Sequence, residues 1–113
     1  MDSHEIVVIG GGPAGMAAAV AAREAGVKKI LLIERDRELG GILQQCIHNG
    51  FGLHHFKEDL TGPEFAERYI RRMGELEIPC KLDTTVLEIT ADREILFINA
   101  RDGVRKITAG AIV

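Results

Sequence analysis

The strongest constraint on the fold is an ordered set of residue types near the N-terminus. Ile6-Val7-Val8-Ile9 is a continuous β-branched run, which predicts a strand buried on both faces, as in a parallel sheet. The next residues, Gly10 to Gly15, read GGGPAG and match the spacing G-x-G-x-x-G. Residues 16–25 are rich in alanine and predict a helix that stops at Gly26. A second buried strand is predicted over residues 30–33.

Each residue type in the glycine cluster has a physical task. Gly10 permits a tight turn out of the first strand, and Gly12 has no Cβ, so a pyrophosphate can approach the backbone. Gly15 allows the helix to pack close to the sheet, and Pro13 suits a first helical turn, where its missing N–H is no loss. The helix N-terminus then offers N–H groups and a partial positive charge to an anion.

An acid ends the second predicted strand. Glu34 follows the glycine cluster by about 20 residues, the spacing at which a carboxylate accepts the hydroxyls of an adenosine ribose. A carboxylate there repels a ribose 2′-phosphate, so an NADP-type ligand is disfavoured at this site. The alternative is a glycine-rich turn that binds nothing. The strand, glycines, helix, strand and acid in this order favour a nucleotide site.

A second glycine pair, Gly40-Gly41, comes shortly after this acid. With "VVIGGGPAG" and Glu34, it makes the chain resemble the FAD-binding start of the pyridine nucleotide-disulfide oxidoreductase superfamily. The resemblance implies FAD as cofactor and a Rossmann-like domain. The contacts that it implies are Gly10, Gly12, Pro13, Ala14, Gly15, Glu34, Arg35 and Gly41. The segment "QQCIHNGFG" resembles the sequences of a narrower subgroup, the glycerol-3-phosphate dehydrogenase partner proteins and amine-oxidising flavoprotein subunits.

The segment of residues 40–56 holds one cysteine and three histidines. Cys46 has no nearby second cysteine, so the local disulfide of some superfamily members is not expected. Cys46, His48, His54 and His55 do not have the ligand spacing of a zinc site, and we predict no metal. We expect Cys46 to be a small buried residue and His54 and His55 to make surface hydrogen bonds. His48 and Asn49 either face the flavin or substrate or are structural, and no catalytic residue is assigned.

The second half of the chain predicts one helix and a meander. Thr61 to Glu64 fits a capping box, so a helix begins near Gly62. Residues 85–90, 94–100 and 104–108 predict three short antiparallel strands with turns at Asp92-Arg93 and Asp102-Gly103. The superfamily resemblance implies an inserted meander of this kind, with Val86 contacting the adenine. The predicted class is thus α/β: a partial Rossmann-like FAD/NAD(P)-binding domain, a parallel sheet with helices plus an inserted three-stranded antiparallel meander.

The last residues, Ala109 to Val113, begin another apolar run. The resemblance implies that this run continues as a parallel strand. We therefore expect residues 1–113 to be the N-terminal part of an FAD-binding dinucleotide domain, truncated at its C-terminal end. We also expect the first strand to have an unpaired edge, with marginal stability and self-association as consequences.

Composition narrows the classes of function. The net charge is −3 and no run of Lys/Arg exceeds two residues, which argues against nucleic acid as partner. No apolar run is long enough for a membrane span, and two separated cysteines indicate a reducing cytoplasm.

We predict the FAD-binding segment of an oxidoreductase that passes a hydride between a nicotinamide cofactor or small organic substrate and FAD. NAD(P)H is expected for the full-length enzyme, and a homo-oligomer or a partner subunit stays open. The alternatives are an NAD-binding dehydrogenase domain and a noncatalytic adenine-nucleotide-binding module.

Overall fold

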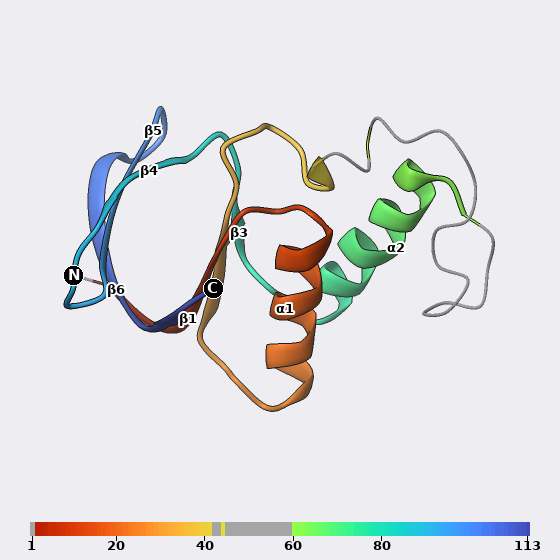
Figure 1. Ribbon diagram of the computed structural model, residues 1–113, viewed down its shortest axis with the longest axis horizontal. Coiled ribbons are helices and arrows are strands. Elements are labelled where there is room, and N and C mark those ends of the chain that lie inside the picture. The colour runs from red at the N-terminus through yellow and green to blue at the C-terminus, as the bar shows by residue number, and fades with distance from the viewer. Residues whose placement is uncertain (1, 42–43, 45–59) are drawn as a thin grey trace.

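The computed structural model describes residues 2–41, 44 and 60–113, and these form a six-stranded mixed sheet with two helices (Figure 1). The strand order is β3-β2-β1-β6-β5-β4. In chain order the elements are β1 (Asp2–Ile9), α1 (Pro13–Glu24), β2 (Ile30–Ile33), α2 (Gly62–Glu75), β3 (Cys80–Lys81), β4 (Thr85–Ile89), β5 (Glu94–Asn99) and β6 (Gly103–Ile112). The predicted α/β class with an antiparallel meander is confirmed.

The parallel half of the sheet has one core on each face. Figure 1 shows α1 and α2 on one side of the parallel strands, and β4 and β5 on the other. Because side chains alternate along a strand, Val8 packs with the helices and its neighbour Val7 packs with the meander. Residues 30–33 of β2 divide in the same way, and all four are buried. Burial on both faces explains why these runs are continuously apolar.

The strand β6 joins the two halves of the sheet. Its first part, from Gly103, pairs antiparallel with β5, and its second part, up to Ile112, pairs parallel with β1. The prediction of two separate elements, residues 104–108 and residues 109–113, was therefore wrong. The predicted unpaired edge of the first strand was also wrong, because β1 lies between β2 and β6. The run from Ala109 already supplies the missing neighbour.

Two other boundaries differ from the sequence-based expectation. Helix α1 begins at Pro13 rather than at residue 16, because the proline supplies the first helical position. The short strand β3 was not predicted; Cys80 and Lys81 pair in parallel with Leu32 and Ile33. Helix α2 begins at Gly62, as predicted, with Thr61 and Glu64 making both bonds of the capping box.

Candidate functional site

The turn between β1 and α1 contains three glycines whose surroundings differ. Gly10 has a φ of +106°, a conformation that favours glycine. A Cβ on Gly15 would overlap the carbonyl oxygen of Gly10, so helix and turn can approach only because position 15 has no side chain. Among the described residues, none lies within 4 Å of a Cβ placed on Gly12, so none of them requires glycine there. This open space lies at the start of α1.

The two helices begin in contrasting ways. Helix α2 is capped by the Thr61 side chain and carries Glu64 in its first turn. Helix α1 has Gly12 at its N-cap position, no side-chain cap and no acid in its first turn. The N–H groups of a first turn have no acceptor within their own helix. At α1 these donors, together with the positive end of the helix dipole, are available to an external anion.

The carboxylate of Glu34 lies at the end of β2, beside the glycine turn. Its Oε1 accepts a hydrogen bond from the N–H of Gly11, and its Oε2 accepts one from the N–H of Asp36, both at 2.7 Å. The residue is 8% exposed. A carboxylate has about four lone-pair sites, so two further donors can still bind. The carboxylate can therefore hold the turn and accept ligand hydroxyls together.

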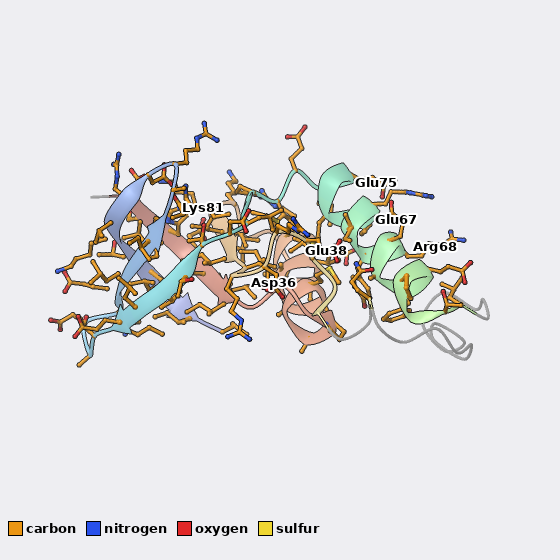
Figure 2. All side chains as sticks on the ribbon, turned by 90° about the horizontal axis from the view of Figure 1, so that it is seen from above. Asp36, Glu38, Glu67, Arg68, Glu75 and Lys81 are labelled. Carbon is orange, nitrogen blue, oxygen red and sulfur yellow. The ribbon has the colours of Figure 1, made fainter. Side chains whose placement is uncertain are left out.

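The second glycine pair folds back onto the first. The N–H of Gly40 donates to the carbonyl of Gly11 at 2.7 Å. A Cβ on Gly41 would lie 3.2 Å from Cα of Gly12. Gly40 and Gly41 both have positive φ, at 112° and 55°. The sequence-predicted Gly-Gly segment therefore contacts the glycine turn. Figure 2 shows Asp36 and Glu38 on the segment between β2 and this glycine pair, next to α1.

A cavity of about 290 Å³ opens between the glycine turn, the end of β2 and the start of β4. It is lined by Ile9, Gly10, Ile33, Glu34, Arg35, Thr84, Thr85 and Val86. Its volume is at the lower end of the range for ligand pockets, so it suits part of a large ligand. Another cavity, of about 250 Å³, is lined by residues that include His4, Lys81 and Arg105 and contains none of the glycine motif.

The structure brings the predicted site residues into one region. Gly10, Glu34, Arg35 and Val86 line the same cavity, although they come from three separate places in the sequence. The remaining predicted contacts lie on the adjoining surface: Gly12, Pro13, Ala14 and Gly15 at the start of α1, and Gly41 against Gly12. What any of these residues binds stays a prediction at this point.

Sequence reasoning missed several residues of this region. Gly11 occupies an unconstrained position of the motif, yet a Cβ there would run into Leu39 and lie 3.2 Å from Oε1 of Glu34. The cavity walls formed by Ile9, Ile33, Thr84 and Thr85 were also not predicted. A signal existed for the threonines, since they come immediately before Val86 at the start of a predicted strand.

Several predictions concern residues outside the described part of the chain. Cys46, His48, Asn49, His54 and His55 all lie there. Among the described residues no group of three potential metal ligands comes together. In the same part of the chain, no helix is long and apolar enough to cross a membrane. Burial raises the pKa of the Cys80 thiol, which keeps it protonated and unreactive.

Comparison with known proteins decides the family. A family model described as FAD dependent oxidoreductase matches residues 5–105. The chain belongs to the FAD-dependent oxidoreductase family. Membership confirms the predicted resemblance, and it makes FAD the cofactor of this family member. The match extends through the glycine turn, Glu34 and most of the meander.

Individual relatives of this FAD-dependent oxidoreductase chain are moderately similar. A ferredoxin–NADP reductase of Streptococcus pneumoniae is 34% identical over 88% of the chain and 31% of its own length. The hydrogen cyanide synthase subunit HcnB of Pseudomonas protegens is 27% identical over 90% of the chain and 22% of its own length. The chain thus spans between about a fifth and a third of the length of these curated relatives.

A solved structure shows the same fold. The L-proline dehydrogenase of P. horikoshii matches 97% of the chain with a TM-score of 0.80, at 21% identity and over 22% of its own length. At this identity the likeness concerns the fold alone. It confirms the predicted Rossmann-like architecture of the FAD-dependent oxidoreductase chain.

Proposed function

We propose that residues 1–113 are part of the FAD-binding domain of a longer flavin-dependent oxidoreductase, and that they hold the ADP half of FAD. The observation that carries the proposal is the meeting of Gly10, Glu34 and Val86 around one cavity, next to the uncapped start of α1. The relatives, which are three to five times longer than the matched segment, support a longer parent protein. We propose a cytoplasmic location, and either self-association or a partner subunit for the parent.

The residues present fit the ADP half of FAD. The open space in front of Gly12 and the uncapped start of α1 suit a diphosphate, which needs N–H donors and close access to backbone. Glu34 would accept the ribose hydroxyls with the lone pairs that Gly11 and Asp36 leave free. Thr85 and Val86 would border the adenine from the far wall of the cavity.

The proposed reaction transfers a hydride between a nicotinamide cofactor or small organic substrate and the flavin. Bound FAD would supply the ring that accepts or donates this hydride. The chain's own residues bind and orient the nucleotide part of the cofactor. NAD(P)H as reductant is supported by the name of the ferredoxin–NADP reductase relative. Because Glu34 disfavours a ribose 2′-phosphate, NADP(H) would bind elsewhere in the parent protein.

The identity of the nucleotide tests this proposal. We expect the purified protein to carry or take up one FAD, identified by chromatography of the flavin that is released on denaturation. We expect ADP to compete with FAD for the same site. Binding of NAD with no affinity for FAD would support an NAD-binding dehydrogenase domain instead, and binding of ADP but not FAD would support a noncatalytic adenine-nucleotide module.

A further inference from the structure

We propose that a polar network between two turns positions the adenosine end of the FAD site. The network consists of Lys81, Thr84, Asn99 and Asp102. The inference rests on the proposed function, because it assigns the network a task in binding the adenosine part of FAD. None of the four was predicted from the sequence as a site residue. We call them the turn network.

The centre of the turn network is the buried hydroxyl of Thr84. Thr84 is 1% exposed, which is unusual for a polar side chain. Its hydroxyl donates to the carbonyl of Leu82 at 2.8 Å and accepts a hydrogen bond from the side-chain amide of Asn99 at 2.9 Å. The hydroxyl is therefore satisfied in both directions, and it ties the turn before β4 to the end of β5.

An ion pair makes a second tie between the same two turns. The ammonium of Lys81 lies 2.9 Å from Oδ2 of Asp102 and 5.6 Å from the ring centroid of Phe97. Asn99 closes the network, since its amide donates to Oδ2 of Asp102 at 3.1 Å and its Oδ1 accepts the N–H of Asp102 at 2.6 Å. Figure 2 shows Lys81 over the sheet, away from α1 and α2. Hydrogen bonding to Lys81, and then to Asn99, lowers the pKa of the Asp102 carboxyl, which favours its charged form.

The backbone between the two ties holds Glu34. The N–H of Glu34 donates to the carbonyl of Lys81 at 2.9 Å, and the N–H of Thr84 donates to the carbonyl of Glu34 at 3.0 Å. Residues 81 and 84 are therefore both hydrogen-bonded to the backbone of Glu34. Between them, Asp83 has a φ of 49°, a left-handed conformation that is uncommon for a residue other than glycine.

The opposite wall of the cavity starts at the same residue. Thr84 lines the cavity itself, and Thr85 and Val86 follow it directly on β4. The distance between Glu34 and the start of β4 sets the width of the cavity. The turn network fixes that distance, because it holds residues 81–84 at both ends. A polar network in which every member is satisfied specifies one geometry more strictly than apolar contacts do.

The test compares the buried Thr84 with Thr90, a half-buried threonine whose hydroxyl is also hydrogen-bonded. Thr84→Val keeps the shape of the side chain but removes both hydroxyl hydrogen bonds, whereas Thr84→Ser keeps the hydroxyl. Thr90→Val is the control, because the Thr90 hydroxyl also accepts a hydrogen bond, from the backbone N–H of Glu94 at 3.2 Å, but at the far end of β4. The dissociation constants for ADP and FAD are measured by titration calorimetry on the flavin-free protein, well below the melting temperature of each variant.

We expect Thr84→Val to weaken the binding of ADP and FAD by about tenfold, equivalent to about 1.4 kcal/mol. Thr84→Ser should restore binding to within about twofold of the wild type, and Thr90→Val should stay within the same range, a change below about 0.5 kcal/mol. Asn99→Ala, which removes the donor to Thr84, should reproduce the loss and keeps the test decisive if Thr84→Val does not fold. The melting temperature is recorded for every variant.

Three results would overturn the inference in distinguishable ways. Lower melting temperatures in Thr84→Val and Asn99→Ala with unchanged ADP affinity would make the network structural only. Equal losses of ADP affinity in Thr84→Val and Thr90→Val would mean that the whole meander, rather than the turn network, determines nucleotide affinity. A wild-type protein that binds neither ADP nor FAD would overturn the proposed function itself.

Discussion

At the scale of single residues, two glycines of one motif have different reasons to be glycine. Gly12 has φ −77° and ψ −174°, an extended conformation that suits a β-branched residue, and its missing Cβ faces open space. Gly15 faces the carbonyl oxygen of Gly10. Gly15 is therefore glycine because of the fold. We propose that Gly12 is glycine because a ligand phosphate approaches it.

This difference predicts opposite phenotypes. Gly12→Val should leave the melting temperature within a few degrees of the wild type and reduce FAD affinity by at least about a hundredfold, because its side chain fills the space that a phosphate would occupy. Gly15→Ala should destabilise the protein by about 1–3 kcal/mol through overpacking. Thermal unfolding and FAD titration of both variants check this. Normal FAD binding by Gly12→Val would contradict the reading of the open space.

Glu34 has a structural task in addition to its proposed binding task. Replacing it by glutamine leaves one side-chain oxygen for two backbone donors, since the new amide group donates rather than accepts. We expect Glu34→Gln to lower the free energy of unfolding by about 1–3 kcal/mol even without nucleotide, the cost of an unsatisfied buried donor. Urea unfolding of the flavin-free protein measures this. Wild-type stability in Glu34→Gln would mean that the bonds to Gly11 and Asp36 contribute nothing.

The environment of the His4 imidazole leads us to expect that the stability of the folded protein depends on pH. Burial, followed by the charge of Lys29, lowers its pKa from the usual 6.5, with Asp2 opposing and Lys81 adding to the effect. Its Nδ1 is also buried and has no hydrogen-bond partner among the residues that the structure describes. The folded protein therefore resists a proton that the unfolded chain accepts, so stability falls as the pH drops below about 6.5. His4→Gln should flatten this part of the stability curve. An equal slope in both proteins between about pH 7 and pH 5 would contradict the assignment to His4.

The positions of the glycine cluster and of Glu34 in the fold could be predicted, because these residues follow a local rule of spacing. Gly11 and Thr84 could not, because their roles depend on atoms far away in the sequence. Gly11 is constrained by Glu34 and Leu39, and Thr84 by Asn99. Tertiary contacts of this kind leave no periodic signal in the chain.

At the scale of elements, the long apolar or amphipathic segments were predictable and the short one was not. β1, α1, β2 and α2 were predicted to within a few residues, because their patterns are strong. β3 has only two residues, one a lysine, and forms because Leu32 and Ile33 offer a partner. The prediction divided β6 into two elements because the sequence pattern of this strand changes along its length. The change occurs where the neighbouring strand changes from β5 to β1.

We expect the N-terminus of α2 to contribute to the stability of the protein but not to FAD binding. Thr61→Ala removes the side-chain acceptor of the α2 capping box, and we expect a loss of about 1 kcal/mol of stability. FAD affinity should stay at the wild-type value, because Thr61 does not line the cavity beside the glycine turn. Chemical unfolding and FAD titration of the variant measure the two quantities. A stability equal to the wild type would show that the capping box does not stabilise α2.

At the scale of the whole molecule, one sheet serves two structural units. The strand β6 belongs to both the parallel half and the meander, so the meander is anchored at a fixed place relative to the glycine turn. This continuity is what brings Val86 across from Glu34. The expectation of an unpaired first strand failed because the last five residues were treated as an interrupted element rather than as the partner of β1.

The most direct test of the account is a crystal structure of the protein with FAD bound. The account predicts both adenosine ribose hydroxyls within about 2.6–3.2 Å of the Glu34 carboxylate, and a diphosphate oxygen at the same distance from a backbone N–H of the first turn of α1. It also predicts the adenine between Glu34 and the start of β4. A diphosphate bound away from residues 10–15, or a ribose on the other face of the sheet, would contradict the central claim.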